Sequence, residues 1–137
     1  MENSMKLTVK AITKNEVFVR NTIAAFCVDS NPSIETIGDI KTAVSEAISN
    51  CIIHAYKQKD GEINITAEIS DNTLHIEISD NGCGIEDVEK AMNPHFSTEQ
   101  ASERAGIGFT IMDAFMDSLK VVSDKNGTTV SMNKKLA

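Results

Sequence analysis

The sequence predicts a two-layer α/β sandwich, in which helices cover a mixed, mostly antiparallel sheet. Three observations support this fold class. Short segments alternate apolar and polar residues with the period of a half-buried strand, and longer segments repeat apolar residues at helical spacing. Turn signals such as Asp60-Gly61 and Asn126-Gly127 separate these segments. No repeat or interdomain linker interrupts the 137 residues, so we expect one domain over 1–137.

The N-terminal part predicts a strand followed by a helix. Residues 5–11 alternate between apolar and polar side chains, as a strand with one buried face does. Thr13 and Glu16 have the spacing of a capping box, which predicts a helix from this point to about Cys27. The Asn31-Pro32 pair then ends that helix, because proline does not fit into a helix interior.

The second helix, at about residues 34–56, has the strongest helical pattern in the chain. Ser33 is placed to cap its N-terminus. Glu46, Asn50 and His54 follow one another at successive turns along the edge of an apolar stripe, where a cleft can open. Eight apolar residues form this stripe: Ile37, Ile40, Val44, Ala47, Ile48, Cys51, Ile52 and Ala55.

A β-hairpin follows, and its second strand leads into a glycine-rich segment. The alternating segments 63–69 and 74–78 predict the two strands, and the second runs directly into Asp80-Asn81-Gly82-Cys83-Gly84. We expect a short helix at about 86–91. Residues 92–105 lack a sustained periodicity, which predicts a loop that acts as a lid.

The C-terminal part predicts a third helix and a second hairpin. Gly106-Ile107-Gly108 opens a helix that continues to about Met116. The segments 119–122 and 128–132 flank the Asn126-Gly127 turn, and Asn-Gly between two such runs is a strong hairpin signal. These two strands complete the predicted sheet.

Charge and composition exclude several classes of protein. The 20 acidic and 13 basic residues give a net charge of −7, a surface that repels nucleic acid, so we expect protein partners. No apolar run approaches the roughly 20 residues of a membrane span, and residues 5–9 do not form a signal peptide, which predicts a cytoplasmic protein. Cys27, Cys51 and Cys83 form no CxxC pair and indicate reduced thiols.

The first candidate site is the polar edge of the second helix. The side-chain oxygen of Asn50 suits Mg²⁺, which takes one or two protein oxygens and completes its shell with water and phosphate. Glu46, one turn earlier, can orient or deprotonate a hydroxyl aimed at a γ-phosphate. The alternative is a solvated polar face, which fits these two residues better when they are considered alone.

Two glycine-rich segments are further candidates. Asp80 at a strand end can accept a hydrogen bond from the exocyclic amine of adenine, and Gly82 and Gly84 let backbone approach the ring. Gly106-Ile107-Gly108 leads into a helix whose free N–H groups suit phosphates. This segment is neither a GxxxxGK[ST] loop nor a complete GxGxxG fingerprint. Either segment alone is weak evidence for a site.

In this order and spacing, the three segments resemble the motifs of the GHKL (Bergerat) ATPase family. Residues 46–54 match its N box, residues 80–84 its DxGxG box, residues 106–108 its second glycine box and Gly127-Thr128-Thr129 its last box. The resemblance covers almost the whole chain. The stretches VSEAISNCIIHAY and NPHFSTEQASERAGIGFTIMDAFMD further resemble the anti-sigma serine kinases of this family.

This resemblance implies a function. Such proteins bind one sigma factor as a homodimer, and they use Mg²⁺ and ATP to phosphorylate a serine of a small anti-anti-sigma protein of the STAS type, which leaves ADP. The segment from about Ser4 to Cys27 precedes every nucleotide motif, so we expect it to form the dimer and part of the sigma-binding surface. The alternatives are a nucleotide-gated sigma-binding protein without phosphotransfer, a histidine-kinase catalytic domain and a stand-alone chaperone-type ATPase; Glu46 favours transfer over binding alone.

Carried over by position, the resemblance also assigns roles to residues. Asn50 would ligate Mg²⁺, Glu46 would be the catalytic carboxylate and Asp80 would hold adenine. Arg104 would either neutralise charge on the γ-phosphate or pin the lid through a surface ion pair, and both roles stay open. Further nucleotide contacts would come from Gly82, Gly84 and Thr129 at adenine, and from Gly106, Gly108, Phe109 and Thr110 at the phosphates. His54, His95, Ser97 and Cys51 receive no covalent role.

Overall fold

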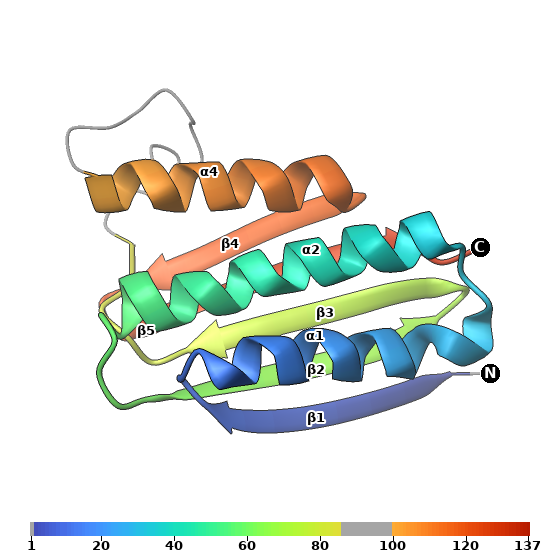
Figure 1. Ribbon diagram of the computed structural model, residues 1–137, viewed down its shortest axis with the longest axis horizontal. Coiled ribbons are helices and arrows are strands. Elements are labelled where there is room, and N and C mark those ends of the chain that lie inside the picture. The colour runs from blue at the N-terminus through green and yellow to red at the C-terminus, as the bar shows by residue number, and fades with distance from the viewer. Residues whose placement is uncertain (1, 86–99) are drawn as a thin grey trace.

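The computed structural model describes residues 2–85 and 100–137, which form one layer of helices packed on one face of a sheet (Figure 1). No helix among these residues is long and apolar enough to cross a membrane. In chain order the elements are β1 (Asn3–Lys10), α1 (Lys14–Cys27), a 3₁₀ turn (Val28–Ser30), α2 (Ile34–Asn50), a π-helical turn (Cys51–Ala55), β2 (Glu62–Ser70), β3 (Thr73–Asp80), α4 (Gln100–Phe115), β4 (Ser118–Asp124) and β5 (Gly127–Lys135).

The sheet has the order β1-β2-β3-β5-β4, and each of these neighbouring pairs is antiparallel. The predicted two-layer sandwich is therefore confirmed, and the expected mixed sheet is antiparallel throughout its described strands. The register aligns one apolar row across all five strands, because each member pairs directly with the next. That row is Leu7, Ile65, Ile78, Val130 and Val121.

The core lies between this sheet and α2. Along β2 and β3 every second side chain is buried, as the alternating patterns predict, while the intervening polar side chains face away from the helices. Ile40, Val44 and Ile48 on α2 are completely buried against the sheet. Burying one such side chain contributes about 1.5–3 kcal/mol, so this helix anchors the fold.

The predicted starts of the first two helices have different outcomes. The capping box at Thr13 is wrong, because Thr13 already has helical backbone angles, and its side chain makes no cap hydrogen bond. Glu16 instead accepts a hydrogen bond from Ser49 Oγ at 3.3 Å. The cap at Ser33 is confirmed: its backbone is extended, with ψ 161°, and its Oγ accepts from the N–H of Thr36 at 3.1 Å.

The second helix does not continue as an α-helix to residue 56, as its periodicity predicts. It widens at Cys51 into a π-helical turn, in which the N–H of Tyr56 reaches the carbonyl of Cys51 at 3.0 Å. The reason is tertiary, since the carbonyl of Ala55 accepts the N–H of Cys83 from the glycine-rich segment at 3.2 Å. The wide turn therefore joins the end of α2 to the end of β3.

The third helix begins earlier than the sequence indicates. Helix α4 starts at Gln100, so residues 100–105 of the expected lid are helical, and Gly106 to Gly108 lie inside the helix instead of opening it. Gln, Ala, Glu and Arg are strong helix formers, and they extend the helix in the N-terminal direction. The expected short helix at 86–91 and the rest of the expected lid, 92–99, lie outside the described residues.

Candidate functional site

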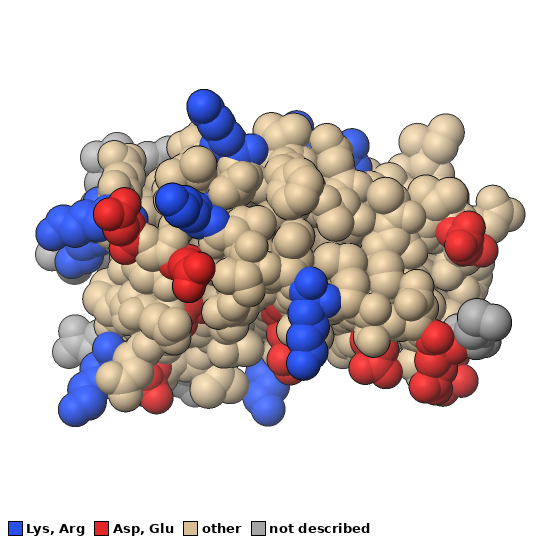
Figure 2. Space-filling view, turned by 90° about the horizontal axis from the view of Figure 1, so that it is seen from below, with Lys and Arg blue, Asp and Glu red and all other residues tan. Residues whose placement is uncertain are grey.

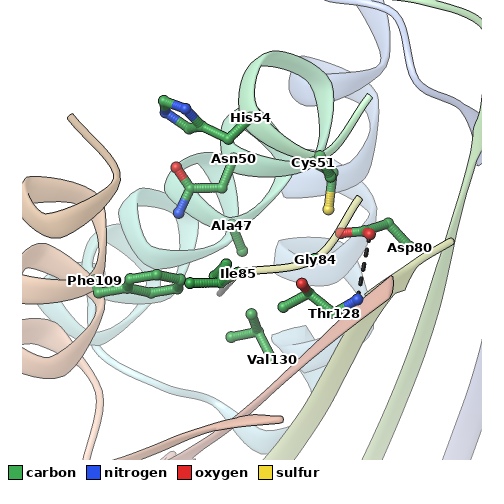
Figure 3. A pocket seen from close by; sticks show the side chains of 11 residues that line it. Ala47, Asn50, Cys51, His54, Asp80, Gly84, Ile85, Phe109, Thr128 and Val130 are labelled. Carbon is green, nitrogen blue, oxygen red and sulfur yellow. Dashed lines mark hydrogen bonds between the residues drawn. The ribbon is translucent and has the colours of Figure 1, made fainter. Parts of the chain in front are cut away.

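A pocket opens where the C-terminal ends of α2 and β3 meet α4 and β5 (Figure 3). The enclosed cavity has a volume of about 40 Å³, and the space reaches about 390 Å³ when the part open to solvent is included. Its walls are mostly apolar with a few polar groups at defined points, as in sites for small organic ligands. Eleven residues line it: Ala47, Asn50, Cys51, His54, Ala55, Asp80, Gly84, Ile85, Phe109, Thr128 and Val130.

Asp80 provides the main acidic group of the pocket. It is the last residue of β3, and only 7% of its surface is exposed. Its Oδ1 atom accepts the N–H of Gly82 at 2.9 Å and the N–H of Thr128 at 3.3 Å, and the second of these bonds is drawn in Figure 3. A buried carboxylate held in this way keeps further lone pairs, with which it can accept a hydrogen bond from an amine of a ligand.

The thiol of Cys51 lies beside this carboxylate at the start of the π-helical turn. Burial raises the pKa of Cys51 well above its ordinary value, and the negative charge of Asp80 and a hydrogen bond to it raise the pKa further. Cys51 therefore stays protonated at neutral pH and donates towards Asp80. Its burial confirms the place of Cys51 in the predicted apolar stripe, whereas its position in the pocket is not indicated by the sequence.

Gly82 and Gly84 allow close packing of the protein on itself. A Cβ added at Gly82 would lie 2.5 Å from the carbonyl oxygen of Ala55. Gly84 has a φ of +78°, and a Cβ there would lie 1.8 Å from the carbonyl oxygen of Asp124. The glycines hold the segment after Asp80 between the π-helical turn and β4, and Gly84 also lines the pocket.

Glu46, Asn50 and Gly108 come from different motifs and meet between α2 and α4. A Cβ added at Gly108 would lie 3.3 Å from Glu46 Oε2, and 3.3 Å from both polar atoms of the Asn50 amide. Any larger residue at 108 would crowd these two side chains. The Asn50 Nδ2 atom is buried, and among the described residues it has no hydrogen-bond partner. This N–H group is therefore available to donate a hydrogen bond to a ligand.

These residues fit a magnesium ion that arrives with a phosphate ligand. Mg²⁺ takes few protein oxygens and completes its shell with water and phosphate, so one amide oxygen can be a sufficient protein ligand. Asn50 can supply that oxygen, and the Glu46 carboxylate lies beside it without serving as a ligand. Among the described side chains, those of residues 2–85 and 107–137, no three from His, Cys, Asp or Glu converge as a protein-only metal site.

The carboxyl group of Glu46 is shifted towards the protonated form. Burial raises its pKa above the ordinary value of 4.5, and the nearby negative charge of Glu16 raises it further. Glu16 belongs to α1, and Ser49 of α2 donates a hydrogen bond to it. A carboxylate with a raised pKa is a better proton acceptor than a solvated one, which suits general-base chemistry.

The structure places Thr128 in the pocket, where the resemblance had suggested Thr129. Thr128 is 7% exposed and lines the pocket with Asp80. By the alternation of the strand, Thr129 points to the opposite face of the sheet, and it lines a second, more open hollow that Asp80 and Thr128 also border. The alternation of buried and half-buried residues along β5 indicates the same assignment, because Val130 points inward and Thr128, two residues earlier, lies on the same face.

The residues of the second glycine box also have mixed outcomes. Their expected position at a free helix start is wrong, because Phe109 and Thr110 lie well inside α4, where backbone N–H groups bond within the helix. Phe109 is 2% exposed and lines the pocket, whereas Thr110 is exposed. The side chains of residues 100–106, including that of Arg104, and residues His95 and Ser97 lie outside the described part.

We expect Glu46→Gln to change the pH dependence of stability. Because the folded-state pKa of Glu46 is raised, wild-type stability falls as pH rises above 4.5 through that pKa. The variant lacks this titration, so the difference in melting temperature, variant minus wild type, should be larger at pH 7 than at pH 4. A smaller gain is expected in a Glu16→Gln background. Thermal denaturation at both pH values is the measurement, and an equal difference at the two would contradict the assignment.

Comparison with known proteins agrees with this geometry. The model of the histidine kinase-like ATPase domain family matches residues 12–134. An anti-sigma F factor of Caldanaerobacter subterraneus subsp. tengcongensis is 55% identical over 133 residues, which are 96% of this chain and 93% of that protein. An anti-sigma F factor of Clostridium acetobutylicum is 48% identical over 100% of this chain and 96% of that protein.

Solved structures share the fold at low sequence identity. The RsbU and RsbW domains of Rv1364c from Mycobacterium tuberculosis match with a TM-score of 0.72 and 18% identity, over 98% of this chain and 32% of that one. The catalytic domain of the histidine kinase ThkA matches with a TM-score of 0.62 and 15% identity, over 98% and 96% of the two chains. The chain therefore belongs to the histidine kinase-like ATPase family, in the group that contains the anti-sigma F factors.

Proposed function

We propose that this protein is an anti-sigma factor and a serine-protein kinase. It binds a sigma factor of the sigma F type, and it uses ATP with Mg²⁺ to phosphorylate a serine of an anti-anti-sigma protein. The observation that carries the proposal is the meeting of Glu46 and Asn50 at Gly108, beside a pocket that contains a buried aspartate. The family match supports ATP binding, and the names of the relatives support the sigma-factor partner.

The pocket offers separate places for the base and the phosphates of ATP. Figure 3 shows Asp80 and Asn50 on opposite sides of the pocket. The Asp80 carboxylate accepts a hydrogen bond from the exocyclic amine of adenine, while apolar side chains cover the ring. The phosphates then lie towards Asn50 and Glu46. A bound magnesium ion would supply positive charge that the phosphates need.

The transfer requires positioning more than covalent chemistry by the protein. Magnesium, when bound at Asn50, would neutralise charge on the phosphates. Glu46 lies one helical turn away and orients the acceptor serine, whose hydroxyl oxygen forms a bond to the γ-phosphorus while ADP leaves. The serine proton passes to the Glu46 carboxylate, whose raised pKa favours this role. A protein that only sequesters a sigma factor has no need of a carboxylate at this point.

The N-terminal strand and helix are the proposed homodimer surface. Strand β1 forms one edge of the sheet, and the outward side of α1 with its flanks exposes Ile12, Val17, Phe18 and Val28, each between 45% and 63%. Figure 2 looks onto this side of the molecule, where uncharged surface extends between scattered charged side chains. A free strand edge beside exposed apolar side chains suits a second copy of the chain, related by a two-fold axis.

Asp80→Asn should weaken ADP binding by about ten- to a hundredfold, because an amide group there faces the adenine amine donor with a donor and loses a charge-assisted bond. Isothermal calorimetry measures this change. Asp117→Asn is the matched control, since Asp117 also accepts a backbone N–H, from Lys135 at 2.7 Å, but does not line the pocket. Unchanged ADP affinity in Asp80→Asn would remove Asp80 from the base site.

Glu46→Gln should keep ADP affinity and sigma-factor binding but lose about 10²–10⁴ in the rate of serine phosphorylation. Asn50→Ala should lose transfer together with metal-dependent nucleotide affinity. Mass spectrometry of candidate anti-anti-sigma proteins after incubation with ATP measures the transfer. Glu35→Gln, exposed in the first turn of the same helix, is the control. If Glu46→Gln phosphorylates its acceptor at the wild-type rate, the carboxylate is structural.

Phe18→Asp should convert the dimer into a monomer, because it places a charge in the centre of the apolar surface on α1. Sedimentation at micromolar protein concentration with ADP present measures the change. Phe115→Asp is the control, since Phe115 is 38% exposed and is the last residue of α4, a helix that lies on the other side of the molecule from β1 (Figure 1). A wild-type protein that sediments as a monomer under these conditions contradicts the dimer proposal.

A further inference from the structure

Ser123 lies at a junction of three segments, although no motif includes it. It is a half-buried residue near the end of β4. The backbone N–H of Ile85 donates to its Oγ atom at 2.7 Å. The same Oγ lies 2.7 Å from the hydroxyl oxygen of Thr128, and 3.3 Å from the carbonyl oxygen of Gly127. One hydroxyl thus links the segment after Asp80 to the β4–β5 hairpin.

The contact between these segments is tight because Gly84 has no side chain. A Cβ at Gly84 would lie 3.2 Å from Ser123 Oγ, in addition to its clash with the carbonyl of Asp124. The glycine segment therefore rests directly on the end of β4, and the bond from Ile85 fastens it there. Ile85 and Thr128 both line the pocket, whereas Ser123 contacts both of them without lining it.

The number of hydrogen bonds that the Ser123 hydroxyl can make limits whether the Thr128 hydroxyl acts as donor or acceptor towards it. A serine hydroxyl donates one proton and accepts up to two. The N–H of Ile85 uses one acceptor position, so the single Ser123 proton goes either to Gly127 or to Thr128. When Ser123 donates to Thr128, which is the shorter contact, the Thr128 oxygen acts as an acceptor there. Its own proton is then free to point into the pocket.

We propose that Ser123 is a positioning residue of the nucleotide site, whose hydroxyl donates to Thr128 and thereby directs the Thr128 proton to a ring nitrogen of the bound base. In adenine, an amine that donates stands next to a ring nitrogen that accepts. Asp80 and Thr128 match these two groups, and they lie together because Asp80 accepts the N–H of Thr128. In guanine the donor and acceptor are exchanged, so the same pair rejects it. The inference rests on the nucleotide binding proposed above.

The test is a double-mutant cycle on ADP affinity, with Ser123→Ala, Thr128→Val and both together. Each single variant should bind ADP about two- to tenfold more weakly, as expected for one lost hydrogen bond. In the Thr128→Val background, Ser123→Ala should weaken ADP binding less than it does in the wild type, because Ser123 acts mainly through Thr128 and only secondarily through Ile85. Ser118→Ala is the control: Ser118 is on the same strand and accepts from Asn133 Nδ2 at 2.7 Å, far from the pocket.

Ser123 is half-buried, so its Ala variant should keep the fold, which thermal denaturation without nucleotide verifies. Wild-type affinity in Ser123→Ala overturns the inference. A full loss in the Thr128→Val background also overturns it, because Ser123 would then act independently of Thr128. Failure of the wild type to bind ADP would instead contradict the proposed function, which separates the two results.

Discussion

The geometry of the site depends on one buried carboxylate. Asp80 Oδ1 accepts N–H groups from Gly82 and Thr128, and so joins the end of β3 to the segment that follows it and to the start of β5. A buried charge is tolerated only where hydrogen bonds replace its hydration. These backbone donors fix the carboxylate, and the carboxylate in turn fixes the two backbone segments on either side of the pocket.

The π-helical turn is the second part of this arrangement. It brings the carbonyl of Ala55 to the N–H of Cys83, and Gly82 packs against the same carbonyl. The turn also places the Cys51 thiol next to Asp80, while Asn50, one residue earlier, remains on the side of α4. The wide turn therefore lets one helix contribute to both ends of the pocket, and π-turns are frequent at functional sites for such reasons.

Sequence patterns predicted the parts of the fold that depend on repeated burial. The strands 63–69 and 74–78 and the stripe of α2 follow directly from alternating or helical spacing, because each residue in them makes the same kind of contact. The start of α4 and the π-turn were missed, since neither is set by periodicity. The first follows from the local helix propensity of residues 100–105, and the second from a single tertiary hydrogen bond to Cys83.

The site shows the same limit at the level of single residues. The motifs located Glu46, Asn50 and Asp80, but no spacing indicates that Gly108 meets the first two, because that contact depends on how α4 crosses α2. The alternation of apolar and polar residues in β5 could have identified Thr128 as the inward residue, since a shift of one position along a strand moves a side chain to the other face. The sequence does not indicate a role for Ser123, because a serine in an ordinary strand matches no motif. Its role is suggested only by the hydrogen bonds from Ile85 and to Thr128. The residues proposed to bind the nucleotide directly thus appear in motifs, whereas the residue proposed to orient one of them becomes visible only through the contacts of the folded chain.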